Sequence, residues 1–164
     1  MSKLDVKLRE VKNRRARREF LEELNNEFSV LLEKSEYQHD TTCLKFAAFT
    51  TWDNDRDCQT TTRGDIEGWE LQYFYTLLEV IHRVKETIPQ NEVLGWFFIN
   101  TDGPFFSLTL ADFIRNLDGI TEYCERNDHF DLGWVGKDQD MGVIIEFNHT
   151  SFCRNQLELC TWGL

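Results

Sequence analysis

The stretch VLGWFFINTDGPFFSL, residues 93–108, decides the fold of this chain. Two short apolar runs, at 93–100 and 105–108, stand on either side of a turn that contains Asp102 and Gly103. Asp-Gly pairs are typical of hairpin loops, because glycine adopts the positive φ that a tight turn needs. We therefore expect a β-hairpin whose two strands are antiparallel.

Other apolar runs extend this sheet in both directions along the chain. Those at 130–136 and 141–148 flank the polar segment KDQD and predict a second hairpin, and the alternating run at 157–163 predicts a final strand. The run CLKFAAFTT, residues 43–51, predicts a buried strand that a polar loop over 53–65 follows. Two hairpins indicate a mainly antiparallel sheet of about five to six strands.

Helical periodicity dominates the N-terminal part of the chain. Apolar residues at helical spacing predict one long helix, or two in series, over residues 3–34. The positions are Leu4, Leu8, Val11, Phe20, Leu21, Leu24, Phe28, Leu31 and Leu32. A second apolar stripe predicts a helix over 65–88 that Asp65 caps and Pro89 ends.

A short helix is expected after the first hairpin. Thr109 and Asp112 have the spacing of a capping box, which would open a helix that runs through Leu117. Asp118 and Gly119 are expected to end it.

This order of elements predicts an α+β fold with the helices packed on one face of the sheet, because an amphipathic helix must bury its apolar stripe. A chain of 164 residues fits a single domain, 1–164. Within it we distinguish an N-terminal helical segment, 1–34, and an α+β core, 40–164. The oligomeric state is left open, since the stripe in 1–34 can pack on its own domain or on a second subunit.

Charge is distributed unevenly along the chain. Residues 1–20 contain eight Lys or Arg and three Asp or Glu. Residues 21–164 contain the remaining ten Lys or Arg and twenty-six Asp or Glu. The net charges are therefore +5 and −16. Such an acidic body repels nucleic-acid phosphate and favours a basic protein partner, because summed surface charge steers encounters.

Compartment and redox state follow from the N-terminus and the cysteines. Residues 1–15 lack the apolar stretch of a secretory signal, and the chain has no apolar run long enough to cross a membrane. Five cysteines without CxxC spacing indicate reduced thiols. We expect a cytoplasmic protein that does not associate with a membrane.

The acidic segment WDNDRDCQ, residues 52–59, resembles the start of a calcium loop at its alternating aspartates. Cys58 stands where the sharp turn of such a loop needs glycine, and Gly64 stands where it needs a bidentate glutamate. We therefore expect no metal here. We instead predict a partner-binding edge in which acidic groups surround two tryptophan anchors, and a solvated acidic loop is the alternative. Its residues are Trp52, Asp53, Asp55, Asp57, Glu67, Trp69 and Glu70.

Other reactive side chains do not form a recognisable site. His149, Cys153 and Cys160 lack the paired short spacings of a structural zinc site, and a strand cysteine such as Cys160 is usually buried and inert. We therefore expect neither a cofactor nor a catalytic constellation, and an enzyme is the less favoured hypothesis.

The C-terminal part, FDLGWVGKDQDMGVIIEFNHTSFCRNQLELCTWGL, together with the length and acidity of the chain, resembles small bacterial immunity proteins of contact-dependent inhibition and other polymorphic toxin systems. That resemblance implies a cytoplasmic protein that binds and neutralises a cognate toxin domain, often a basic nuclease.

Two alternatives remain open. One is a small cytosolic hydrolase or transferase that uses Cys, His and carboxylates gathered from several elements. The other is a regulatory module that contacts nucleic acid through the basic segment KNRRARRE, residues 12–19. The interpretation without a binding role is that this segment is a solvated helix surface with Glu/Arg pairs.

Overall fold

The computed structural model describes nine segments of the chain. These are residues 2–24, 26–39, 57–62, 77–83, 93–99, 103–127, 132–138, 140–148 and 156–163. Two helices in series open the fold, α1 (Lys3–Glu23) and α2 (Asn26–Lys34), as the periodicity predicts. Residues 77–83 are helical within the predicted 65–88 helix, and the rest of that prediction lies outside the described residues.

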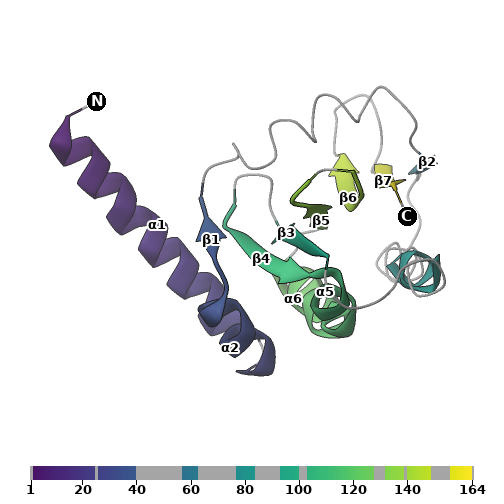
Figure 1. The fold of residues 1–164 in the computed structure, drawn as a ribbon, viewed down its shortest axis with the longest axis horizontal. Coiled ribbons are helices and arrows are strands. Elements are labelled where there is room, and N and C mark those ends of the chain that lie inside the picture. Colours follow the sequence, from purple (N-terminus) through teal and green to yellow (C-terminus); the bar gives the residue numbers. More distant parts are fainter. Residues whose placement is uncertain are drawn as a thin grey trace.

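The described strands form one sheet, in the order β1-β4-β3-β5-β6-β7-β2 (Figure 1). Every neighbouring pair is antiparallel. The predicted hairpins are present as β3 with β4 and as β5 with β6, and the predicted final strand is β7. The strands are β1 (Tyr37–Gln38), β2 (Asp57–Thr62), β3 (Leu94–Phe98), β4 (Phe105–Thr109), β5 (Leu132–Gly136), β6 (Gly142–Asn148) and β7 (Gln156–Trp162). The α+β class and the antiparallel sheet are confirmed.

The described part of the sheet has seven strands, one more than the predicted five to six. The two-residue β1 is too short to leave a pattern in the sequence. β2 lies inside the segment that we predicted as a polar loop, and that prediction was wrong for residues 57–62. Threonines favour strands, and the partner of β2 is β7 at the other end of the chain, so no local hairpin signal marks it. The predicted strand over 43–51 lies outside the described residues.

The helices after β4 confirm one prediction and contradict another. Thr109 caps α5 (Leu110–Arg115), with its Oγ1 accepting a hydrogen bond from the Asp112 backbone N–H at 3.0 Å. The predicted stop at Asp118 and Gly119 is wrong, because α6 (Leu117–Asn127) runs through both. Burial of an apolar stripe outweighs the roughly 1 kcal/mol that an interior glycine costs. The stripe consists of Leu117, Ile120, Tyr123 and Cys124.

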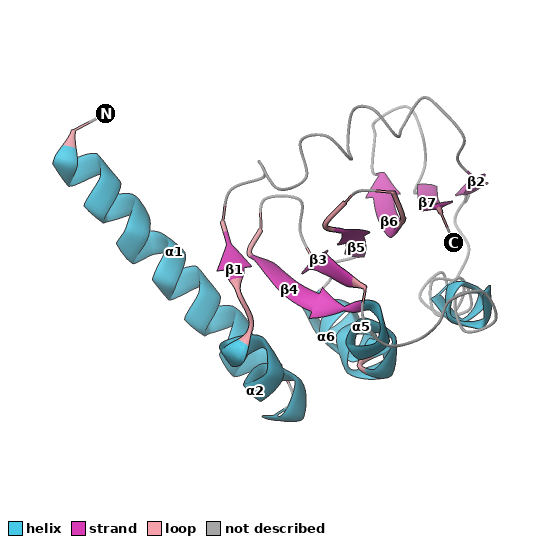
Figure 2. Cartoon of the chain, in the orientation of Figure 1, coloured by secondary structure: helices cyan, strands magenta, loops and turns pink. Residues whose placement is uncertain are grey.

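Helices cover one face of the sheet, as predicted (Figure 2). The larger apolar cluster joins that face to residues of α2, helix 77–83, α5 and α6. The other face carries a second buried cluster made of strand residues alone, among the residues described. Its members are Trp96, Phe98, Phe105, Val135, Ile144 and Trp162.

Aromatic rings lie directly over glycines of the neighbouring strands. A Cβ added at Gly95 in β3 would overlap the Trp134 ring of β5. The same overlap arises at Gly133 with Phe98 and at Gly142 with Trp162. These glycines are therefore required by close approach, and each ring and glycine pair fixes the register of two strands.

Substituting these glycines with alanine tests this arrangement. We expect Gly95→Ala, Gly133→Ala and Gly142→Ala each to lower the free energy of unfolding by about 1–3 kcal/mol, because a buried ring or the backbone must shift. Gly136→Ala is the matched control, since its Cβ would meet the Met141 side chain at 3.2 Å and the Met141 backbone oxygen at 3.3 Å, against 2.3 Å to the Trp134 ring at Gly95. Urea denaturation measures all four, and equal losses at Gly136 and Gly95 would contradict the assignment.

Candidate binding surface on the N-terminal helix

The structure leaves the predicted acidic edge largely untested. Trp52, Asp53, Asp55, Glu67, Trp69 and Glu70 lie outside the described residues. Asp57 opens β2, the edge strand farthest from β1, and its backbone pairs with Thr161 of β7. The acidic edge therefore stays a prediction, with the position of Asp57 in the sheet now defined.

Among the described residues, Cys58 of β2 and Cys160 of β7 are register partners, whereas Cys124, His39 and His82 lie in other elements. Cys160 in β7 and Cys124 in α6 are both buried, as expected for Cys160. Within the described segments, no three His, Cys, Asp or Glu side chains come together in a way that could hold a metal ion. His149 and Cys153 lie outside these segments, so the enzyme hypothesis stays untested.

α1 is the most exposed element that the structure describes, with no buried residue along its length. Its first turn is closed by a capping box in which Ser2 and Asp5 exchange hydrogen bonds of 2.8 and 3.1 Å. The hydrogen bond from the Ser2 backbone lowers the pKa of Asp5. This cap keeps the end of α1 helical although the N-terminal half of the helix extends beyond the other elements (Figure 1).

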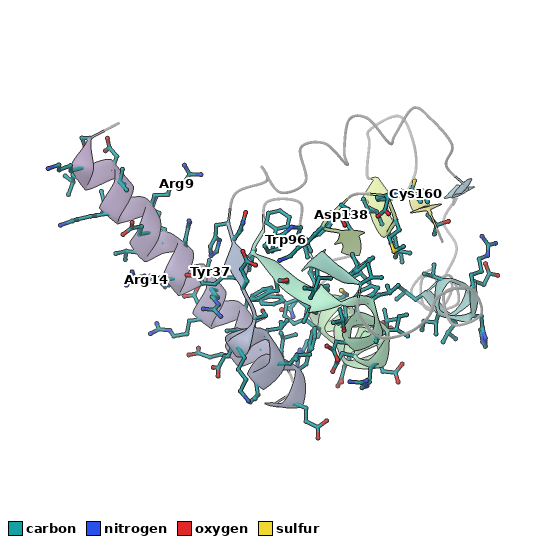
Figure 3. All side chains as sticks on the ribbon, in the orientation of Figure 1. Arg9, Arg14, Tyr37, Trp96, Asp138 and Cys160 are labelled. Atoms are coloured by element: carbon teal, nitrogen blue, oxygen red, sulfur yellow. The ribbon has the colours of Figure 1, made fainter. Side chains whose placement is uncertain are left out.

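Apart from Asn13 and Arg17, the basic segment of α1 is an exposed helix surface with internal ion pairs, as one of its interpretations predicts. Arg15 pairs with Glu19 at 2.7 Å, and Arg18 pairs with Glu22 at 3.6 Å. Exposed pairs at this spacing stabilise a helix only slightly, because water screens both charges. Arg9 and Arg14 extend from this exposed part of the helix (Figure 3).

Arg17 fastens α1 to the body of the protein. One guanidinium nitrogen, Nη2, donates to the backbone oxygens of Leu32 and Glu33 at 3.3 and 3.0 Å. These are carbonyls of the last turn of α2, where the helix dipole favours a cation. The guanidinium carbon also lies 3.9 Å from the centre of the Tyr37 ring and 5.9 Å from that of Phe106. Arg17 thus joins α1, α2, β1 and β4.

Replacing Arg17 tests this junction. We expect Arg17→Ala to lower the free energy of unfolding by about 1–3 kcal/mol, because two charge-assisted hydrogen bonds and a cation–π contact are lost. Arg17→Lys should recover only part of it, since an ammonium lacks the planar fork that can stack and donate together. Arg14→Ala, an exposed position on the same helix, is the control. Similar urea midpoints for the Arg14 and Arg17 variants would rule out the anchoring role.

His39 lies against the same junction. Burial lowers its pKa from 6.5, a hydrogen bond to the Asn13 backbone opposes this, and the positive charge of Arg17 lowers it further. Its ring meets the Tyr37 ring edge-on, with 5.6 Å between the centres. The neutral imidazole is therefore the form that fits between α1 and β1.

This environment predicts a dependence of stability on pH. The folded protein holds the pKa of His39 below the unfolded value of 6.5, so the stabilising neutral form is fully present above pH 6.5. That contribution is lost as the pH falls through the lowered folded pKa. Urea midpoints between about pH 7.5 and 5.5 measure the effect. We expect His39→Gln to flatten the slope and His82→Gln, at an exposed position, to leave it unchanged.

Two clefts border α1. The larger, of about 700 Å³, lies between α1 and α2 and is lined by groups of both charges, among them Arg14, Arg18, Glu22 and Glu33. The smaller, of about 320 Å³, adjoins Tyr123 and Glu23. Burial, with a contribution from Glu23, raises the pKa of Tyr123 to about 12, so its phenol is a hydrogen-bond donor at neutral pH. The larger cleft thus carries groups of both signs, whereas the charged residues that line the smaller one, Glu19 and Glu23, are both acidic.

No similar protein was found. The chain matches no family model, and no curated protein or solved structure is similar to it. None of the described helices has the length and apolar character needed to cross a membrane. The function must therefore be argued from the chemistry of the chain alone.

The first part of α1 carries the most exposed large apolar side chains of the described residues. The exposed fractions are 66% for Leu4, 53% for Leu8 and 63% for Val11. Successive helical residues are rotated by about 100°, so these three lie about 120–180° from the anchoring Arg17. They form a stripe on the side of α1 that faces away from the body.

The sequence prediction grouped this stripe with the later apolar residues of the same helix and did not separate the two faces. Phe20, Leu21 and Leu24 pack against the core, whereas Leu4, Leu8 and Val11 do not. Counting 100° steps along residues 4–24 could have revealed the difference, because helical geometry alone separates the faces.

Proposed function

We propose that this chain is a protein-binding domain whose acidic body engages a basic protein partner, in the manner of an immunity protein that neutralises a toxin domain. The supporting observation is where its carboxylates lie. Residues 21–164 carry a net charge of −16. Among the residues whose burial the structure describes, the only buried polar or charged ones are Thr121 and Thr161, so every carboxylate of the body within that set lies at or near the surface.

Exposed carboxylates suit binding through complementary charge. A surface of one sign accelerates encounters with an oppositely charged protein, and a few buried aromatic anchors then hold the complex. On α6, Asp118, Glu122 and Glu125 are exposed at i, i+4 and i+7 and contribute to this field. The predicted edge at residues 52–57 and 67–70 would add the aromatic anchors, and a cytoplasmic location fits such a protein.

The partner to test is the toxin domain encoded next to the gene for this chain. We expect a specific complex whose association rate falls by about tenfold or more between roughly 0.05 and 0.5 M salt, because screening removes the steering. Stopped-flow fluorescence measures this rate. The proposal fails if no complex forms with a neighbouring basic domain.

Charge reversal distinguishes a specific contact at the acidic edge from the general electrostatic attraction of the acidic body. Asp53→Lys, Asp55→Lys and Asp57→Lys together should weaken the complex by about a hundredfold or more, because a central contact becomes repulsive. The matched control reverses Asp118, Glu122 and Glu125 on α6, with the same change in net charge. We expect the control to slow association and leave dissociation nearly unchanged. If both triple variants raised the dissociation rate equally, the acidic edge would not be a specific contact with the partner.

A further inference from the structure

The outward stripe of α1 is the feature that the acidic-body proposal leaves unexplained. Leu4, Leu8 and Val11 are exposed, lie opposite the anchored face and follow the i, i+4, i+7 spacing by which a helix docks into another surface. Lys7 and Lys12 flank the stripe on its two sides, and neither is among the ion pairs of the described residues. The stripe therefore fits an apolar surface with an acidic rim.

Such a surface exists on α2 of the same chain. Val30 is 46% exposed and lies between Glu27 and Glu33, which are exposed three residues before and after it. Lys34, exposed four residues after Val30, adds one cation, so this rim keeps an excess of negative charge. Outside α1, the described part exposes only one other large apolar side chain, Leu94 of β3. The stripe of the same molecule points away from the body, so it is offered to a second molecule.

The charges beside the stripe and those on α2 distinguish two possible dimer contacts. Stripe against stripe would bring Lys7 and Lys12 of two copies together, which opposes association. Stripe against α2 brings these lysines beside Glu27 and Glu33 and places apolar groups against Val30. We propose that the outward stripe of α1 docks on α2 of a second copy of this chain, so that the protein forms a reciprocal dimer.

The proposed dimer has closed two-fold symmetry, so it does not extend into a chain of molecules. A two-fold dimer contains the same contact twice. When the two α1 helices run antiparallel, the stripe of each copy lies on α2 of the other copy. The outward face between them carries Arg15 with Glu19 and Arg18 with Glu22, and these pairs can exchange partners across an antiparallel contact. One helix face alone offers less than the roughly 800 Å² per partner of a standard interface, and the reciprocal arrangement doubles the contact.

Sedimentation velocity on the full chain tests the dimer. Over about 5–500 µM, the range that an interface of modest size requires, we expect a reversible shift from monomer to dimer. Leu4→Gln, Leu8→Gln and Val11→Gln together keep helix propensity and should leave the protein monomeric. Leu94→Ser, an exposed apolar position on β3, is the control and should still dimerise.

A charge swap tests the docking partner. Lys7→Glu with Lys12→Glu should abolish the dimer, and so should Glu27→Lys with Glu33→Lys. An equimolar mixture of the two reversed proteins should form a heterodimer, because both of its contacts are complementary. The acidic stripe of one variant meets the basic α2 of the other, and the second contact has the wild-type charges. Circular dichroism confirms that each variant is folded.

Three results would overturn the proposal: a wild-type protein that stays monomeric, a stripe variant that still dimerises, or a mixture that gives no heterodimer. Monomeric protein that instead cosediments with vesicles containing anionic lipid would assign the stripe to a membrane surface. The dimer does not depend on toxin binding, so either proposal can fail alone.

Discussion

Trp134 is the side chain on which the centre of the sheet depends. Its ring starts from β5, lies over Gly95 of β3 and donates from its indole nitrogen to the Leu108 backbone oxygen of β4, at 3.2 Å. One fully buried residue thereby joins three strands. Because a one-residue slip would turn the ring to the opposite face, this contact sets the register that the helices need in order to find an apolar face to cover.

The sequence predicted those parts of the fold whose signals are local. Asp102 and Gly103 mark a hairpin, and Thr109 marks a helix start, because a turn or a cap is determined by residues within a few positions of it. β2 and the continuation of α6 through Gly119 escaped prediction for the opposite reason. Each depends on a partner that is distant in the chain, so tertiary burial and pairing outweigh the local preference for a loop or a stop.

The candidate surfaces follow the same rule. That the basic segment is solvated with Arg15 and Arg18 paired to glutamates was predictable, since i and i+4 neighbours meet on any helix. The contacts of Arg17 with the end of α2 and of His39 with Asn13 were not, because they join residues that only the folded chain brings together. The acidic edge was chosen from composition and spacing, and its members other than the backbone of Asp57 lie outside the described residues.

The pairing of β2 also has a consequence for the order in which the protein assembles. β3 and β4 close a short hairpin, and so do β5 and β6, so these pairs require little loop-closure entropy. Among the described strands, β2 pairs only with β7, and Asp57 must meet Thr161 across about a hundred residues. We therefore expect the strand that leads out of the acidic segment to join late and to open early. Its amide hydrogens should exchange sooner than those of β5, and a ligand bound at that edge would slow them most.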